Sequence, residues 1–212
     1  MADYEQIAQG VIKGEMEKVG GLTQQAIDGG AEPMEVIDQG LMSGMSVVGE
    51  RFKSGEMYIP EVIMSAKAMS AGMEIVKPLI VGGKSASRGK VLVGTVKGDL
   101  HEIGKKLVVM MMESAGLEVE DLGIDISPED FAKAVREKKP DALGMSALLT
   151  TTMLSMKDTI ETLKEGGIKD GVKVLVGGAP VTLDFAEEIG ADGWAPDAVS
   201  AKDKTLEFLG RK

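Results

Sequence analysis

The sequence predicts an α/β protein with two parts, a small helical bundle followed by a larger part built on a parallel β-sheet. Over residues 1–81 the apolar side chains recur at helical spacing. From residue 90 to residue 212, short apolar runs alternate with helical stretches. Residues 82–89 between them are small and polar, as in a flexible linker. We therefore expect a helical domain at residues 1–81, a linker at residues 82–89 and an α/β domain at residues 90–212.

Four helices are expected in the N-terminal part. Asp3 can cap the first helix, and Gly29 and Gly30 end the second. Pro33 and Pro60 stand at the starts of the third and fourth helices, because the first turn of a helix tolerates proline. Four short helices with brief connections are typical of a four-helix bundle.

The C-terminal part alternates strictly between strand and helix. Strands are expected at Val91–Val96, Val119–Leu122, Ala142–Met145, Val172–Val176 and Gly193–Ala195. Helices are expected at Ile103–Ala115, Pro128–Lys138, Thr152–Lys164, Leu183–Ile189 and Ala201–Leu209. Strands that are continuous apolar runs indicate a parallel sheet with helices on both faces. Five such strands fit a flavodoxin-like doubly wound sheet of order 2-1-3-4-5, whose ligands bind at the carboxyl ends of the strands beside strand 1.

The composition excludes several classes of function. The 34 acidic residues outnumber the 24 basic ones, and a net charge of −10 disfavours nucleic acid and anionic membranes as partners. The chain has no cysteine, so disulfides, thiolate metal sites and cysteine nucleophiles are excluded. It has no apolar run long enough to span a membrane and no signal peptide at its start, so a cytoplasmic location is expected.

The chain contains one histidine, and it stands at the predicted switch point of the sheet. It is His101, in the segment Gly98-Asp99-Leu100-His101-Glu102-Ile103-Gly104 directly after the first predicted strand. Asp99 can accept the proton of one ring nitrogen, which makes the other nitrogen a better metal donor. The two glycines let the backbone approach a bulky ligand. A lone histidine is more often a surface or packed residue, so this segment alone leaves the role of His101 open.

Three further loops are expected at the same edge of the sheet. The loop after the third strand is a run of hydroxyl and apolar residues from Ser146 to Thr152. The loop after the fourth strand contains Gly177 and Gly178, which we expect to leave an open slot, and the last strand leads into residues 193–198. Such a slot could hold a long polar ligand end-on. Each part also has an ordinary explanation, since glycine pairs are common after strands of doubly wound sheets and hydroxyls cap helices.

The spacing of these motifs resembles a known signature. Asp99-x-His101-x-x-Gly104, Ser146-x-Leu148 and Gly177-Gly178, separated by residues 105–145 and 149–176, resemble the signature of the cobalamin-binding domains of methyltransferases and mutases. The resemblance covers the whole C-terminal half. It implies that the benzimidazole tail of the cofactor leaves the cobalt, enters the slot beside the sheet and is replaced by His101 as the axial cobalt ligand. It also implies a relay from His101 through Asp99 to Thr152, where the family usually has serine.

The same resemblance implies a set of cofactor-binding residues on the loops after the strands. They are Gly98, Asp99, Leu100, His101, Glu102, Ile103, Gly104, Ser146, Leu148, Thr150, Gly177, Gly178, Ala179, Trp194, Ala195, Asp197 and Ala198.

The N-terminal half resembles the helical cap of B12-dependent methyltransferases, over the segment from Gly44 to Glu61. In methionine synthase such a cap lies over the upper face of the corrin. The resemblance implies that Met45, Val48, Phe52 and Ile59 cover that face here.

Together these resemblances imply a corrinoid carrier protein of an anaerobic methyltransferase system, of the kind that serves methanol, methylamine, methoxyaromatic or betaine methyltransferases. Such a protein uses cobalamin or a related corrinoid, whose cobalt alternates between cobalt(I) and methylcobalt(III). Its implied partners are a substrate:corrinoid methyltransferase, a second methyltransferase with a thiol or tetrahydrofolate acceptor, and a reductive activating protein. The chain itself would be a non-catalytic carrier, since the active sites belong to its partners.

Three other classes fit less well. The corrinoid subunit of an adenosylcobalamin-dependent mutase shares the C-terminal signature, but such small subunits lack a helical cap. A B12-dependent light-sensing repressor needs a DNA-binding domain, for which this acidic chain has no room. A phospho-receiver module needs an aspartate at the end of the third strand, where this sequence has Gly144-Met145-Ser146.

Overall fold

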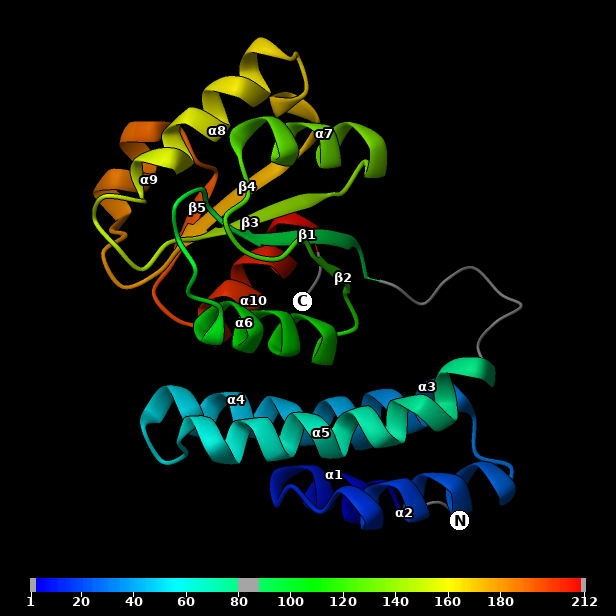
Figure 1. The fold of residues 1–212 in the computed structure, drawn as a ribbon. Helices are drawn as coiled ribbons and strands as arrows, with labels where there is room; N and C mark the ends of the chain where they lie inside the picture. The colour runs from blue at the N-terminus through cyan, green and yellow to red at the C-terminus, as the bar shows by residue number, and fades with distance from the viewer. Residues whose placement is uncertain (1–2, 80–87, 211–212) are drawn as a thin grey trace. The chain divides into compact units, whose positions relative to one another are not determined.

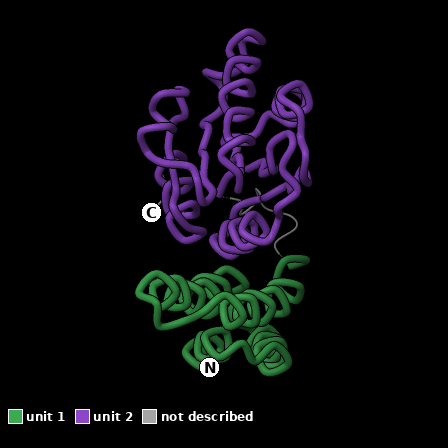
Figure 2. The backbone as a smooth tube through the Cα atoms, turned by 60° about the vertical axis from the view of Figure 1, so that its left-hand side comes forward, with its two compact units in different colours: residues 1–86 green, residues 87–212 purple. Residues whose placement is uncertain are grey.

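The computed structural model describes residues 3–79 and 88–210. The chain divides into two compact units, Met1–Ala86 and Ser87–Lys212 (Figure 2). The predicted linker at residues 82–89 lies outside the described residues, except for Arg88 and Gly89. The linker and the domain boundaries beside it therefore stay predictions.

The N-terminal unit consists of four helical segments, as the apolar spacing predicts. They are α1 (Tyr4–Ile12), α2 (Met16–Asp28), the continuous run of α3 (Pro33–Glu35), η1 (Val36–Met42) and α4 (Ser43–Ser54), and α5 (Ile59–Val76), followed by the short 3-10 helix η2 (Lys77–Leu79). The carboxylate of Asp3 caps α1 by accepting the N–H of Gln6. Pro33 and Pro60 lie in the first turns of α3 and α5, as predicted.

The middle of the third predicted helix departs from α-helical geometry. Residues 36–42 form a π-helix, η1, in which Val36, Ile37 and Leu41 are buried. Gly40 in this segment lies against Ile7, where a Cβ atom would come within 3.0 Å of the isoleucine side chain. Apolar residues at helical spacing do not distinguish α from π hydrogen bonding over so short a stretch, so the sequence does not predict this segment.

The C-terminal unit contains a five-stranded parallel sheet in the predicted order β2-β1-β3-β4-β5. The strands are β1 (Lys90–Thr95), β2 (Glu118–Asp121), β3 (Ala142–Ser146), β4 (Lys173–Gly177) and β5 (Gly193–Ala195). The helices are α6 (Ile103–Ser114), α7 (Pro128–Lys138), α8 (Leu154–Glu165), η3 (Lys169–Gly171), α9 (Leu183–Ile189) and α10 (Ala198–Phe208). The predicted doubly wound architecture is confirmed. Helix α10 begins three residues before the predicted start at Ala201, because the carboxylate of Asp197 caps it.

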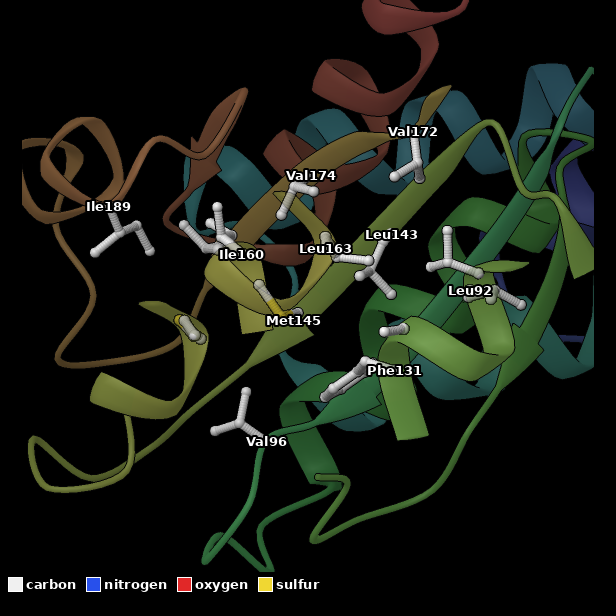
Figure 3. Close-up of a cluster of buried hydrophobic side chains, with 14 of the residues drawn as sticks. Leu92, Val96, Phe131, Leu143, Met145, Ile160, Leu163, Val172, Val174 and Ile189 are labelled. Carbon is white, nitrogen blue, oxygen red and sulfur yellow. The ribbon is translucent and has the colours of Figure 1, made fainter. Parts of the chain in front are cut away.

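Helices cover both faces of this sheet, with α6 and α10 on one side and α7, α8 and α9 on the other (Figure 1). Successive strand residues point to opposite faces, so each face has its own core. Leu143 and Met145 of β3 pack with Phe131 of α7 and Ile160 of α8 (Figure 3). The opposite core contains Val91, Val93, Met112, Ala142, Leu175 and Leu206.

The parallel register brings three loops to one edge of the sheet. Thr95 of β1 pairs with Ser146 of β3, which pairs in turn with Gly177 of β4. The chain leaves the sheet directly after each of these residues, so the loops after β1, β3 and β4 meet at this edge. No helix in the described parts of the chain is long and apolar enough to cross a membrane.

Candidate functional site

A buried carboxylate organises the edge of the sheet beside β1. The side chain of Asp99 is fully buried. Its Oδ1 accepts the backbone N–H of His101 at 3.0 Å and lies 2.7 Å from the ring Nδ1 of the same residue. Its Oδ2 accepts the backbone N–H of Leu148 and the hydroxyl of Thr152, both at 2.7 Å. One carboxylate thereby joins the loop after β1 to the loop after β3.

These hydrogen bonds determine which ring nitrogen of His101 carries the proton. Burial by itself raises the pKa of Asp99, but the hydrogen bonds from Leu148, Thr152 and His101 outweigh burial and hold that pKa well below its ordinary value. The carboxylate is therefore ionised at neutral pH and can only accept, so Nδ1 of the neutral ring must be the donor. Nε2 then has a free lone pair.

The ring of His101 is open to solvent and to a ligand. Its side chain is 52% exposed, and Nε2 has no hydrogen-bond partner among the residues that the structure describes. A neutral imidazole whose far nitrogen is held by a buried carboxylate is a favourable arrangement for a metal ligand.

The donor set decides what kind of metal could bind here. The described part of the chain contains no group of three or more His, Cys, Asp or Glu side chains that could hold a metal ion. His101 would therefore supply one ligand only, and the metal would bring the others with it. A metal already held in a macrocycle, with one free axial position, meets that condition.

Large exposed apolar side chains occur on the loop of His101 and on the loop after β3 that Asp99 joins to it. Leu100 is 67% exposed and Ile103 is 76% exposed, on either side of His101. Leu148 and Leu149 on the loop after β3 are 43% and 44% exposed. Soluble proteins rarely gather large exposed apolar side chains unless they form a binding surface. This edge of the sheet therefore offers an apolar rim around one nitrogen donor.

The turn that carries His101 is held at both ends. Gly98 has φ +82°, a conformation that a side chain disfavours. The backbone N–H of Asp99 donates to the carbonyl oxygen of Val96 at 3.1 Å. The buried hydroxyl of Thr95 donates to the carbonyl oxygen of His101 at 2.9 Å. The side chain of His101 therefore leaves a short, tightly bonded loop.

The glycines at the end of β4 allow neighbouring backbone to come close, and the open slot expected beside them stays a prediction. A Cβ atom on Gly178 would lie 1.8 Å from the carbonyl oxygen of Ala147, and one on Gly177 would lie 2.8 Å from the carbonyl oxygen of Ala195. The backbone of the neighbouring loops occupies this space. Gly177 allows the close approach of β4 and β5, Gly178 allows that of the loops after β3 and β4, and Ala179 beside them is exposed.

The predicted residues of the β5 region have structural contacts of their own. Trp194 is half-buried, and its indole Nε1 donates to the carbonyl oxygen of Val181 at 2.8 Å. Ala195 and Ala198 are buried, so their side chains have no free surface. Asp197 accepts the N–H of Ser200 at 2.8 Å and so caps α10. Any contact of the two alanines with a ligand would have to come from their backbone.

The remaining predicted residues of the two loops differ in their exposure. Glu102 is paired with Lys106, with 2.6 Å between Oε1 and Nζ. Gly104 has open space beside it, with nothing within 4 Å of a Cβ position. Ser146 is half-buried and its carbonyl oxygen accepts the N–H of Val96, whereas Thr150 is exposed. Gly104 and Thr150 are therefore accessible to a ligand at this edge.

The four predicted cap residues do not share one environment in the helical unit. Met45 and Val48 on α4 are buried, at 2% and 0% exposure. Phe52 is half-buried, and Ile59 at the start of α5 is 42% exposed. Ile59 and part of Phe52 therefore have surface that can meet a ligand, and the other two are packed inside.

Sequence reasoning missed two residues that link the His101 loop and helix α6 to the connection between β2 and α7. The carboxylate of Asp125 accepts the backbone N–H of Gly98 at 2.8 Å. The fully buried Lys105 donates to the carbonyl oxygen of Gly123 at 2.8 Å. Neither residue belongs to the recognised motifs, and no local pattern distinguishes them from ordinary surface charges.

Both halves of the chain are similar to known proteins. A family model described as a B12 binding domain matches residues 89–202, and a second model with the same description matches residues 4–77. The chain is 43% identical over 206 residues to the dimethylamine corrinoid protein of Methanosarcina barkeri, covering 97% of this chain and 96% of the relative. It is 42% identical over 214 residues to a corrinoid protein of Desulfitobacterium hafniense, covering 100% and 99% of the two chains.

Solved structures are similar over the same length. A chain of the methanol:cobalamin methyltransferase complex MtaBC of Methanosarcina barkeri superimposes with a TM-score of 0.87 at 34% identity, covering 99% of this chain and 80% of that one. A cobalamin-binding protein of Desulfitobacterium hafniense superimposes with a TM-score of 0.83 at 30% identity, covering 98% and 99%. The similarity therefore includes the helical half as well as the sheet.

Proposed function

The chain belongs to the family of corrinoid proteins of methyltransferase systems and binds a corrinoid, and from this premise we propose that it carries a methyl group from one methyltransferase to another, with His101 as the axial ligand of the cobalt. The corrinoid supplies a cobalt centre that can accept a methyl group and give it up again. The residues of the chain bind this group, orient it and adjust the strength of its axial ligand.

The observation that carries the assignment is the hydrogen bonding of Asp99. Its ionised carboxylate holds Nδ1 of His101 at 2.7 Å and leaves the lone pair of Nε2 available. Because a charged acceptor orients the ring and raises its basicity, it makes Nε2 a stronger donor to a metal. Thr152 donates to the other oxygen of the same carboxylate at 2.7 Å. The three residues therefore form one chain of hydrogen bonds that ends at Nδ1, the ring nitrogen opposite the metal-facing Nε2.

This chain of hydrogen bonds also offers a way to release the ligand. Since the bound group would accept a methyl group and give it up again, His101 would need to hold it more strongly in one state than in the other. A proton delivered to Asp99 or to the ring would weaken the donor and favour release. We propose that Thr152 and Asp99 control whether this proton is bound.

The apolar rim around His101 supports binding of a large flat group. Leu100, Ile103 and Leu148 would pack against the macrocycle, since their exposed surface otherwise remains in water. Thr150, whose side chain carries a hydroxyl and which is exposed, would bind polar groups at the periphery. Of the four predicted cap residues in the helical unit, Phe52 and Ile59 have exposed surface that could cover the bound group.

The relatives support a first partner and a class of donor. One structural relative is a chain of a methanol:cobalamin methyltransferase complex. Seven relatives named for dimethylamine or trimethylamine are 41–45% identical to this chain. We therefore propose a methyltransferase for a methylated amine as the donor partner. A second methyltransferase with a thiol or tetrahydrofolate acceptor and a reductive activating protein complete the proposed cycle.

The unique histidine permits a direct test of the ligand. The chain is grown with ¹⁵N-histidine, loaded with hydroxocobalamin and reduced to cobalt(II), and its electron paramagnetic resonance spectrum is recorded. A coordinated ¹⁴N nucleus splits each cobalt line into three, whereas a ¹⁵N nucleus splits it into two. Because the chain has a single histidine, a change from three lines to two assigns the bond to His101.

The variant His101→Ala provides the control. It should keep the corrinoid but show a base-off visible spectrum and no nitrogen splitting. A spectrum of this variant identical to that of the unmutated chain would exclude His101 as the ligand.

The carrier role is tested separately with a ¹⁴C-labelled methylated amine. The label should stay with the loaded chain after gel filtration when only the donor methyltransferase and a chemical reductant that brings the cobalt to cobalt(I) are present. It should leave when the acceptor methyltransferase and its thiol are added. Label that never becomes associated with the chain would contradict the carrier role.

A further inference from the structure

Asp125 stands out as a residue with an unusual backbone conformation next to the His101 loop. Asp125 and Lys139 are the non-glycine residues with positive φ in the described parts of the chain, at 56° and 46°. Lys139 ends helix α7, a position where this conformation is common. Asp125 lies in the connection between β2 and α7, which has no such explanation. A non-glycine residue in this region has a cost of roughly 1 kcal/mol, so the surrounding contacts have to hold it there.

The contacts of Asp125 all reach the loop that carries His101. Its Oδ1 accepts the backbone N–H of Gly98 at 2.8 Å. Its own backbone N–H donates to the carbonyl oxygen of Asp99 at 3.1 Å. Oδ1 also lies 3.3 Å from Nζ of Lys97, in an exposed ion pair. The N–H of Gly98, and less strongly Lys97, hold the pKa of Asp125 below its ordinary value, so its carboxylate is a charged acceptor.

The connection that carries Asp125 is itself fastened to β1. The carbonyl oxygen of Gly123 accepts the N–H of Thr95 at 3.0 Å, and the N–H of Ile126 donates to the carbonyl oxygen of Thr95 at 3.0 Å. Val96 and Ile126 form a parallel bridge. The connection therefore continues the parallel pairing of β1 for a few residues beyond the end of β2.

A buried lysine fastens the same connection to helix α6. The side chain of Lys105 is fully buried. Its ammonium group is paired with Asp121 and donates to the carbonyl oxygen of Gly123 at 2.8 Å. Burying an ammonium group is costly unless its partners are well placed, so this arrangement indicates a rigid attachment. Helix α6 begins at Ile103, two residues after His101.

From these contacts we propose that the connection between β2 and α7, residues 122–127, is a clamp that positions the His101 loop, with Asp125 as the positioning residue and Lys105 as its anchor on α6. The role of the clamp in cobalt ligation rests on the proposed function, in which His101 is the axial ligand. The clamp bonds to the backbone of Gly98 and Asp99. Leu148 and Thr152 bond to the carboxylate of Asp99 instead. The carboxylate of Asp99 orients the ring, and the clamp holds the backbone from which Asp99 and His101 extend.

Three variants distinguish the roles of the Asp125 carboxylate, its charge and its ion pair with Lys97 in holding the His101 loop. Asp125→Gly removes the carboxylate and keeps a residue that adopts positive φ without strain. Asp125→Asn keeps an oxygen acceptor and also tolerates this conformation. Lys97→Ala removes the exposed ion pair and leaves the bond to Gly98 intact.

Two measurements are made on each full-length variant. The first is amide hydrogen exchange of Gly98 in the cofactor-free chain, which reports on the clamp without any metal. The second is the histidine-bound fraction after loading with hydroxocobalamin, read from the visible spectrum and from the nitrogen splitting in the cobalt(II) state. Circular dichroism confirms that each variant is folded.

The clamp predicts a specific pattern across the variants. In Asp125→Gly, exchange of the Gly98 amide should be about 10-fold faster, as expected when a hydrogen bond to a charged group is lost. The affinity of His101 for the cobalt should fall by about 10-fold, the lower end of the range for residues that support a metal ligand. Asp125→Asn should recover most of both effects. Lys97→Ala should stay within about twofold of the unmutated chain, because exposed ion pairs contribute little.

The contrary outcomes are distinct. Unchanged Gly98 exchange in Asp125→Gly would overturn the clamp. Faster exchange with an unchanged histidine-bound fraction would show that the contact does not position the ligand, and would overturn the proposal as well. An effect of Lys97→Ala as large as that of Asp125→Gly would assign the role to the ion pair instead. A normal spectrum of His101→Ala would refute the ligand assignment alone, since Gly98 exchange tests the clamp without the cofactor.

Discussion

At the scale of single residues, Asp99 does two things with one carboxylate. Its Oδ1 holds the ring and the backbone of His101, and its Oδ2 holds the loop after β3 through Leu148 and Thr152. The position of the ring and the position of that loop therefore depend on each other. A change at Asp99 should affect the donor strength of His101 before it affects the fold.

We expect Asp99→Asn to keep the corrinoid but to hold His101 less firmly on the cobalt. The amide can still bond to the ring, but it lacks the charge that strengthens the donor. A loss of this kind weakens metal ligation by about 10–100-fold. Because a proton competes with the cobalt for Nε2, the pH at which the visible spectrum changes from histidine-bound to base-off should rise. A spectrophotometric pH titration measures this midpoint.

Thr152 provides the matched comparison for that titration. Thr152→Val keeps the shape of the side chain and removes the hydroxyl that donates to Asp99, so its midpoint should move in the same direction by a smaller amount. Thr152→Ser keeps the hydroxyl and should titrate like the unmutated chain. Equal midpoints for all variants would refute the hydrogen-bond relay and leave the ligand assignment intact.

At the scale of elements, the helical unit depends on the close approach of two helices. Helix α4 approaches α1 at Gly44, where a Cβ atom would lie 2.6 Å from the carbonyl oxygen of Ala8. A backbone atom cannot move aside as a side chain can, so the two helices would have to separate. The interior of this unit is therefore sensitive to a single methyl group at this position.

We expect Gly44→Ala to destabilise the helical unit by about 1–3 kcal/mol, the usual cost of overpacking an interior. Gly21→Ala is the control, because Gly21 lies within α2 with nothing within 4 Å of its Cβ position. That change should stabilise the unit by up to about 1 kcal/mol, since alanine favours helix more than glycine does. Calorimetry measures the change in unfolding free energy of each variant, and the two changes should have opposite signs. Two equal effects would contradict the close approach of α1 and α4.

The β4–β5 edge of the sheet contains a carboxylate with a similar structural role. Asp192 accepts Nζ of Lys169 at 2.6 Å and the N–H of Val174 at 2.7 Å. Burial would raise the pKa of Asp192, but Lys169 and the N–H of Val174 lower it overall. A carboxylate whose pKa is lowered by folding stabilises the fold above its unfolded pKa of about 4 and loses that contribution as the pH falls through the folded value.

Asp192→Asn should therefore lower the stability of the C-terminal unit at pH 7 by about 1–2 kcal/mol, and the difference from the unmutated chain should shrink below about pH 4. Urea unfolding followed by fluorescence measures it, because Trp194 is the single tryptophan of the chain and belongs to this unit. Asp203→Asn, at a carboxylate that is 53% exposed, should have an effect below about 0.5 kcal/mol. A difference that persists unchanged to pH 3 would contradict the assigned role of Asp192.

At the scale of the whole molecule, the chain consists of two compact units with separate interiors. The sheet of the C-terminal unit has a core on each face, formed within that unit. A carrier of the proposed kind presents one cobalt face to at least two partners in turn. The simplest way to expose and cover that face is a shift between two arrangements of the helical unit, and the Gly/Ser-rich segment at residues 82–89 predicts where the chain would bend.

We expect trypsin to cleave preferentially at Lys84 or Arg88 and to release two folded fragments. Mass spectrometry identifies the cut, circular dichroism tests the helical content of the smaller fragment, and Trp194 fluorescence tests the larger one. Loading with the corrinoid should slow the cleavage if the cofactor favours one arrangement of the units. Complete protection of this segment, with and without cofactor, would contradict the predicted hinge.

The sequence by itself determined the features that depend on local order along the chain. The change of apolar period near residue 90 predicts the two parts, and the alternation of apolar runs with helical stretches predicts the sheet order. Parallel strands place their carboxyl ends at one edge. The resemblance of the motifs to a known family implied the contact of Asp99 with His101 and Thr152, which the structure contains.

The tertiary structure alone decided the features that depend on contacts between distant segments. Asp125 and Lys105 support the His101 loop, Gly177 and Gly178 pack against neighbouring backbone, and Met45 and Val48 are buried instead of exposed. A charged residue, a glycine or an apolar residue at these positions is compatible with several environments. Which one it has depends on what the fold brings within a few ångströms of it, and spacing along the chain does not contain that information.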